Sequence, residues 1–153
     1  MGMSTDINKP LNVFRNDETL LRLLVYKPKS LTDNQPDPLS EDLPDILDLD
    51  EDELWALRDK HISTTSNSDD LSDEKLCRIY VYLGNRRPAS NNYTLAEQEI
   101  IIDVLCHDSY QIKEQRMFKI SDRLNELLID ERITGVTKIQ YLSGSIIGSP
   151  AEY

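Results

Sequence analysis

The stretch that decides the fold runs from Gln98 to His107 and reads Gln-Glu-Ile-Ile-Ile-Asp-Val-Leu-Cys-His. We interpret it as a central strand, because it is rich in apolar and β-branched residues. Successive side chains of a strand point to opposite faces of the sheet. One face is therefore expected to carry Ile100, Ile102, Val104 and Cys106, and the other Ile101, Asp103, Leu105 and His107.

A second strand is expected just before this one, and the two are expected to form an antiparallel pair. The run Lys75–Leu83 alternates in character, which predicts one apolar and one amphipathic face. We interpret Gly84–Pro88 as the turn and residues 89–96 as an irregular link into the next strand. The apolar face is expected to carry Cys77, Ile79, Val81 and Leu83, and the other face Arg78, Tyr80 and Tyr82.

Helices are predicted before and after the strand pair in the sequence. Residues 113–128 form the strongest helical pattern, with an apolar stripe made of Met117, Ile120, Leu124, Leu127 and Leu128. An earlier stripe predicts a helix that begins either near Leu11 or at Asp17. Pro28 is expected to end that helix, since proline cannot continue the hydrogen-bond pattern. Residues 1–10 are expected to be a frayed arm.

Residues 136–142 are predicted to return as a strand, with Ile146-Ile147 as a candidate extension. This order of elements predicts an α+β fold, in which helices pack on one face of a small, mostly antiparallel sheet. The expected parts are an N-terminal arm (1–10), a single α+β domain (11–29 and 75–148), an acidic, proline-rich insertion (30–74) and a C-terminal tail (149–153).

The charge of the chain is concentrated in one segment. The formal net charge is −11, and residues 33–74 hold fifteen of the 28 acidic residues but only two of the 17 basic ones, Arg58 and Lys60. This argues against ordinary phosphate binding, which needs clustered lysine and arginine. No secretory signal and no apolar run of about 18 residues is present, so an intracellular protein without a membrane span is expected.

The inserted segment contains the most distinctive residues. Lys27–Pro44 holds four of the seven prolines, which is typical of a loop. Asp48–His61 is predicted to be a short acidic helix that carries Trp55, the only tryptophan of the chain. Two interpretations of Trp55 stay open: it packs on the parent domain, or it anchors a partner.

Arg86-Arg87 is the one basic doublet in the sequence. It suits a solvated turn or an intersubunit salt bridge better than a contact to a phosphate backbone. The residues predicted to contact a partner are Trp55, Arg86, Arg87, Asp50, Glu51, Asp52 and Glu53.

No motif predicts a reaction, a cofactor or a metal ion. The run Asp48-x-Asp50-x-Asp52 resembles the opening of a calcium loop, but Glu53 stands where the required glycine should be. Cys106-His107-Asp108 cannot act as a catalytic trio on a strand, because neighbouring side chains point apart. His61 is expected among carboxylates, and His107 is expected to be a half-exposed polar residue. Cys77 and Cys106, far apart in sequence, are expected to be small buried apolar groups, and the protein is not expected to be an enzyme.

Three stretches together resemble the tail-completion, or tail-terminator, proteins of long-tailed bacteriophages. Leu11–Leu24, read Leu-Asn-Val-Phe-Arg-Asn-Asp-Glu-Thr-Leu-Leu-Arg-Leu-Leu, resembles the opening helix of that family. Glu99–His107 resembles its central Ile-x-Val-Asp-Val strand, and Ile120–Leu128 resembles the helix that follows. The long insertion at residues 30–74 departs from the family pattern. So does the end of the sequence at Tyr153, where a further strand is expected; a short sheet or an edge completed by a neighbouring subunit would result.

The resemblance implies a structural protein of the virion, located at the top of the tail and, during assembly, in the host cytoplasm. Proteins of this family form a ring, commonly hexameric, that caps the tail tube. The implied partners are further copies of the chain, the tail tube protein and a head-completion or connector protein. DNA is expected to pass through the lumen without specific binding, which an acidic wall favours.

Two other functions stay open. A head–tail connector would share the architecture but sit nearer the portal. An acidic intracellular adaptor that binds a basic partner would instead use the inserted segment alone.

Overall fold

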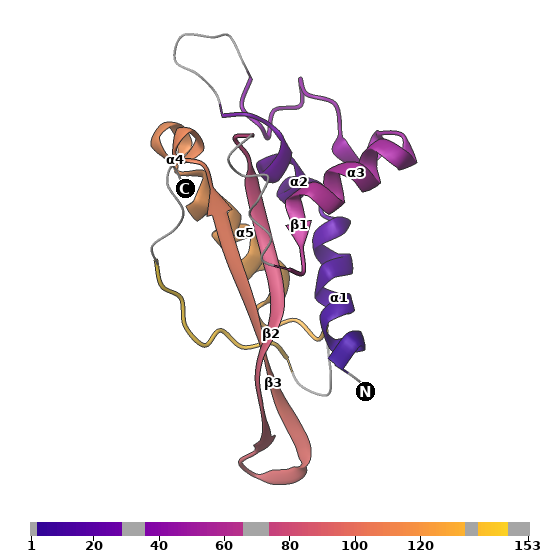
Figure 1. The fold of residues 1–153 in the computed structure, drawn as a ribbon, viewed down its shortest axis with the longest axis vertical. Helices are drawn as coiled ribbons and strands as arrows, with labels where there is room; N and C mark the ends of the chain where they lie inside the picture. Colours follow the sequence, from indigo (N-terminus) through magenta and orange to yellow (C-terminus); the bar gives the residue numbers. More distant parts are fainter. Residues whose placement is uncertain (1–2, 29–35, 66–73, 134–137, 147–153) are drawn as a thin grey trace.

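The computed structural model describes residues 3–28, 36–65, 74–133 and 138–146 and confirms the α+β class (Figure 1). In chain order, the helices and strands are α1 (Met3–Arg15), α2 (Glu18–Val25), the 3-10 helix η1 (Ile46–Asp48), α3 (Glu51–His61), β1 (Ile62–Ser63), β2 (Cys77–Ala89), β3 (Asn92–Cys106), α4 (Asp108–Glu114) and α5 (Arg116–Leu128).

The three strands of the described residues lie in the order β1-β2-β3. β2 and β3 are antiparallel, as expected, whereas β1 pairs with β2 in parallel, so the sheet is mixed. The stretch around Ile102 is therefore not the central strand, and this prediction was wrong. β1 comes from the inserted segment 30–74, in which no strand was predicted, and by pairing with Ile79 and Tyr80 it makes β2 the central strand.

The predicted alternation of side chains along both long strands is confirmed. Cys77 lies opposite Cys106 and Val81 lies opposite Ile102, so the two apolar faces coincide. This face belongs to the hydrophobic core, which also contains residues of α1, α2 and α5. Core residues from these helices include Leu11, Phe14, Leu20, Leu21, Leu24, Ile120, Leu124 and Leu128.

The predicted turn at Gly84–Pro88 is wrong, because β2 continues through these residues to Ala89. The register shifts by one residue between Leu83 and Arg86, which marks a β-bulge. A Cβ atom on Gly84 would lie 2.8 Å from Cδ1 of Ile101, so the side chains of the partner strand use the space that a larger residue at position 84 would need. The link predicted over residues 89–96 is mostly strand, and the long hairpin projects beyond the body of the protein (Figure 1).

The N-terminal residues from Met3 onward are helical, so the frayed arm is also corrected. Pro10, Leu11 and Phe14 are fully buried, and their packing fixes α1 on the sheet although its first turns are polar. Asp17 begins a separate helix: its carboxylate accepts a hydrogen bond of 2.8 Å from the backbone N–H of Leu20.

The predicted helix and strand after residue 112 differ more from the structure than the earlier elements do. The long helix of residues 113–128 is interrupted at Gln115, whose left-handed conformation (φ 54°) separates α4 from α5. Residues 138–142 do not form a strand, and Ile146 does not extend one; residues 136, 137 and 147 lie outside the described ranges. The backbone around Ile139 instead bonds to Asp130 and Glu131, at 2.9 Å each.

The acidic segment packs against the same core as the rest of the chain. Ile46, Leu54 and Ile62 are buried at 9% exposure or less and belong to the core cluster. α3 contacts α2, β1 and β2. The described part of the segment is therefore held by apolar burial, and the acidic side chains of residues 36–57 are exposed.

Candidate interaction surfaces

Trp55 lies on α3 at the boundary between the core and solvent. The same helix buries Leu54, Arg58 and His61, whereas Trp55 remains 42% exposed. The guanidinium carbon of Arg58 lies 5.1 Å, and that of Arg15 5.7 Å, from the centre of the indole ring. These cation–π contacts hold the ring in place. Trp55 therefore packs on the body of the protein and still offers a partly exposed aromatic surface.

The predicted acidic residues lie together at the start of α3. Asp50 occupies the N-cap position, and Glu51, Asp52 and Glu53 form the first turn. All four are exposed. Carboxylates at this end of a helix are stabilised by its dipole. We call Trp55 together with Asp50, Glu51, Asp52 and Glu53 the α3 surface.

Arg86 and Arg87 lie on β2 in the projecting part of the hairpin, within residues 86–97, which we call the hairpin tip. Nε of Arg87 lies 3.1 Å from Glu97 across the hairpin. Nη1 of Arg86 lies 3.5 Å from the carboxylate of Asp6 on α1. The hairpin tip also presents Tyr93, which is 88% exposed, and Leu95, which is 42% exposed.

The structure divides the predicted contact residues between two places. The α3 surface lies at one end of the molecule, and the hairpin tip projects from the opposite end (Figure 1). The sequence analysis proposed these contact residues individually, but it did not show this separation. The sequence analysis also did not single out Tyr93. Its position between two polar residues, in a stretch interpreted as a link, was the only indication that its side chain is exposed.

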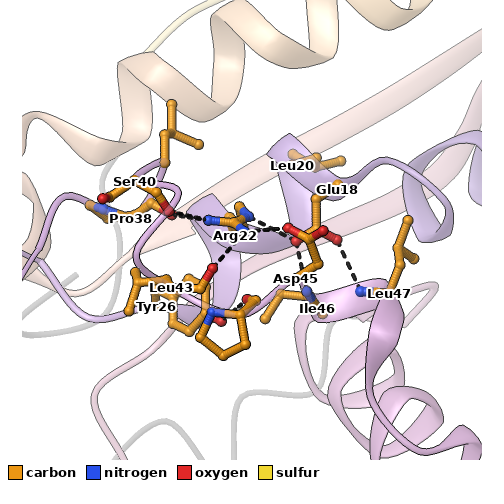
Figure 2. A network of polar contacts seen from close by, with 12 residues as sticks. Glu18, Leu20, Arg22, Tyr26, Pro38, Ser40, Leu43, Asp45, Ile46 and Leu47 are labelled. Atoms are coloured by element: carbon orange, nitrogen blue, oxygen red, sulfur yellow. Dashed lines mark hydrogen bonds and ion pairs between the residues drawn. The ribbon is translucent and has the colours of Figure 1, made fainter.

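A polar network that the sequence did not reveal anchors the start of the acidic segment (Figure 2). Arg22 is buried on α2, and its side chain donates hydrogen bonds to the carbonyl oxygens of Pro38, Ser40 and Leu43, at 3.3, 2.8 and 3.0 Å. It also forms an ion pair with Asp45 at 2.5 Å. One guanidinium thereby fixes four points of the proline-rich loop.

Glu18 completes this network one helical turn before Arg22. Its carboxylate pairs with Nε of Arg22 at 2.8 Å. The same carboxylate accepts hydrogen bonds from the backbone N–H groups of Ile46, at 2.7 Å, and Leu47, at 2.9 Å. Burial lowers the pKa of Arg22, but the hydrogen bonds to Asp45 and Glu18 outweigh it and raise the pKa overall, so Arg22 stays charged. The only sequence signal was a charged residue within a leucine-rich helix.

Other arginines bind the ends of helices in the same way. Arg116 is fully buried and donates to the carbonyl oxygens of Leu23 and Tyr26, at 2.5 and 2.7 Å, where α2 ends. Arg58 donates to the carbonyl oxygen of Arg15 at 2.9 Å, where α1 ends. Carbonyl groups at a helix C-terminus lack partners within the helix, so these arginines satisfy them.

The two cysteines are buried, as expected, but the structure also places them side by side. Cys77 and Cys106 are opposite each other in the β2–β3 register, and both are free thiols. Burial raises the pKa of the Cys77 thiol, and its hydrogen bond with Cys106 raises it further. A thiol of this kind is a poor nucleophile, because the reactive form is the thiolate.

Both histidines differ from the expectation. His61 is buried, and its Nδ1 lies 2.6 Å from the carbonyl oxygen of Cys77, so a backbone group holds it in place. Burial lowers the pKa of His61. His107 is buried rather than half-exposed, because its ring nitrogen accepts a hydrogen bond from the backbone N–H of Ser109 and caps α4.

Within the described ranges, no three His, Cys, Asp or Glu side chains gather closely enough to hold a metal ion. The acidic run that resembles a calcium loop passes directly into α3 at Glu51. No described helix has the length and apolar character needed to cross a membrane.

Comparison with known proteins gives a family and a relative. The sequence matches the family model described as YomW over residues 17–153. It is 36% identical over 144 residues to an SPbeta prophage-derived uncharacterized protein, YomW, of Bacillus subtilis (strain 168). The alignment covers 87% of this chain and 81% of that protein. No solved structure matches. The chain belongs to the YomW family.

Proposed function

We propose that the protein is a structural component of a phage virion, a tail terminator whose copies form a ring on the end of the tail tube and join it to the head. The Bacillus subtilis relative is prophage-derived, which supports a phage origin for this chain. One observation carries the proposal: two exposed surfaces of different chemistry lie at opposite ends of one subunit. A ring subunit needs such an arrangement, because it contacts a neighbour on each side.

The internal anchoring of the subunit supports a structural task. Arg22, Arg58 and Arg116 tie loops and helix ends to the core through backbone carbonyl groups. Such contacts restrict the motion of the segments they join. A ring that must match both a tube and a head requires subunits of constant shape.

The charge distribution supports a role near DNA without binding to it. The described residues 36–57 contain no lysine or arginine, and their acidic side chains are exposed. A surface of this kind repels phosphate groups. In a ring it would let DNA pass through the lumen without holding it.

The test is an in-frame deletion of the gene in the phage or prophage that carries it, with the particles examined by negative-stain electron microscopy. We expect over-long tails without attached heads. Normal-length tails left unjoined would instead assign the protein as a head–tail connector. Complete, infectious particles would overturn both assignments.

A binding measurement provides an independent check. The purified protein is expected to show no tight binding to duplex DNA at physiological salt, because the exposed acidic residues oppose it. Tight binding would contradict passage through an acidic lumen. If the deletion leaves particles intact and the protein captures a basic partner, the adaptor function is favoured.

A further inference from the structure

We propose that the hairpin tip of one copy docks on the α3 surface of the next copy. This inference rests on the proposed ring and names the contact that closes it. The occupant of each surface is thus a second copy of this chain, and charge complementarity between the two surfaces is the reason for this choice.

The hairpin tip has the composition of a docking element. Tyr93 and Leu95 expose apolar area that no contact within the subunit covers fully. Arg86 and Arg87 add positive charge, against the single carboxylate of Glu97 in residues 86–97 and that of Asp6 on α1, which lies 3.5 Å from Arg86. Ion pairs between exposed groups contribute little, so the contact between Arg87 and Glu97 is easily exchanged for one in another copy.

The α3 surface offers the complementary features. The exposed part of the indole of Trp55 supplies an apolar area that Tyr93 or Leu95 can cover. Glu51 and Asp52 precede Trp55 by four and three residues, so they share its side of the helix. A partly apolar centre with a charged border is the usual composition of a protein–protein contact.

The position of the two surfaces determines the kind of assembly. They are different patches at opposite ends of the subunit, so their contact is head-to-tail rather than between identical patches (Figure 1). Head-to-tail contacts generate a closed ring when the rotation between copies permits it. This is the geometry that the proposed function needs.

Charge reversal tests the contact in the phage. One variant carries Arg86→Glu and Arg87→Glu, and another carries Glu51→Lys and Asp52→Lys. Each is supplied alone, or both together, to a phage from which the gene has been deleted, and the titre of infectious particles is measured. Alone, each variant opposes like charges at every contact and is expected to lower the titre by about 100-fold or more.

The two variants supplied together are expected to restore the titre to within about tenfold of the original. In an alternating ring, each contact then pairs opposite charges again. A variant that fails to fold cannot be rescued in this way, and thermal unfolding of each purified protein checks folding directly. The neutral variant Glu51→Gln with Asp52→Gln places no cation at the helix start, so it should lower the titre less than the charge-reversal variant does.

A matched control reverses two exposed acids elsewhere, Asp122→Lys and Glu131→Lys, and should keep the original titre. If folded reversal variants each restore infection alone, or fail together, the docking contact is wrong while the terminator function stands. If the deleted phage is infectious without any added copy, the proposed function itself fails. An effect of the hairpin variant alone would indicate contact with a different partner.

Discussion

Arginine at position 22 shows how one side chain can organise a loop that has little regular structure. Its guanidinium spans the carbonyl groups of Pro38, Ser40 and Leu43 and the carboxylate of Asp45. Lysine could satisfy only part of this set, because its ammonium group lacks the planar fork of arginine. Position 22 is therefore the residue on which the placement of the acidic segment most depends.

We expect Arg22→Met to lower the free energy of unfolding by about 2–3 kcal/mol, because it leaves partly buried carbonyl and carboxylate groups without a donor. Urea unfolding followed by circular dichroism measures this. Arg132→Met, at an exposed arginine, is the control and should change the value by less than about 0.5 kcal/mol. Equal losses in the two variants would show that the network contributes nothing specific.

His61 predicts a dependence of stability on pH. Burial lowers its pKa from the ordinary value of 6.5, so the unfolded chain binds a proton more readily than the folded protein. Stability from this residue is full above pH 6.5 and falls as the pH drops below it, by at most about 1.4 kcal/mol per pH unit. The fall ends at the folded pKa.

The matched variant is His61→Asn, whose amide can keep the hydrogen bond to the carbonyl oxygen of Cys77 without titrating. Urea unfolding at pH 7.5, 6.0 and 5.0 should show a steeper acid loss in the original protein than in this variant. Parallel curves would mean that carboxylates alone set the response.

Residue roles were the least predictable part of the protein. Trp55 and the acids beside it could be proposed as contact residues because an aromatic residue in an acidic segment is unusual. The role of Arg22 could not, since three of its acceptors are backbone groups sixteen to 21 residues away; only the pairing with Glu18 follows a spacing that the sequence shows. The capping role of His107 depends on a helix that begins at Asp108, which the sequence placed later.

At the scale of elements, α2 and α5 are joined by a carboxylate with two functions. Asp17 caps α2 through the N–H of Leu20 and forms hydrogen bonds of 3.0 and 2.6 Å with Arg123 on α5. The hydrogen bond to Asp17 raises the pKa of Arg123. The start of one helix is thereby fixed against the side of another.

We expect Asp17→Ala to destabilise the protein by about 2 kcal/mol and Asp17→Asn by about 1 kcal/mol. Asparagine can still cap the helix, but it loses the charge that pairs with Arg123. Thermal or urea unfolding separates the two values. If the two variants were equally destabilised, the cap would contribute nothing beyond the ion pair.

The sequence predicted the strand faces correctly but not the strand ends. Alternation around Ile79 and Ile102 follows directly from the geometry of a strand. Gly84 suggested a turn, whereas it lies beside a bulge within a continuing strand, and glycine at a turn and glycine at a bulge look alike in a sequence without the partner strand. Residues 138–142 alternate like a strand, but within the described ranges Ile139 bonds only to the backbone of Asp130 and Glu131, which is too little to form a ladder.

For the whole molecule, the projecting hairpin is separable from the core. No residue from 86 to 97 belongs to the hydrophobic core cluster, and Leu83 and Ile100 are paired just before the bulge. The general architecture was predictable because apolar patterns of helix and strand are local. The opposite placement of the α3 surface and the hairpin tip was not, since it depends on how those elements pack in space.

Replacing residues 85–98 by Asn-Gly should leave the core folded, with a loss of less than about 1 kcal/mol in the free energy of unfolding. Gly84 and Glu99 would then flank a two-residue hairpin turn. The same protein should fail to complement the deleted phage, since it lacks the hairpin tip that we propose as the docking element. A large loss of stability would show that the hairpin supports the fold rather than the assembly.

The anchoring of the proline-rich loop by Arg22 has a consequence for how the family can vary. Three of the acceptors are main-chain oxygens, which every amino acid carries. Replacing side chains at positions 38, 40 and 43 therefore leaves those acceptors in place. The side chains of this loop can accordingly change without removing the hydrogen bonds by which Arg22 fixes the path of its backbone.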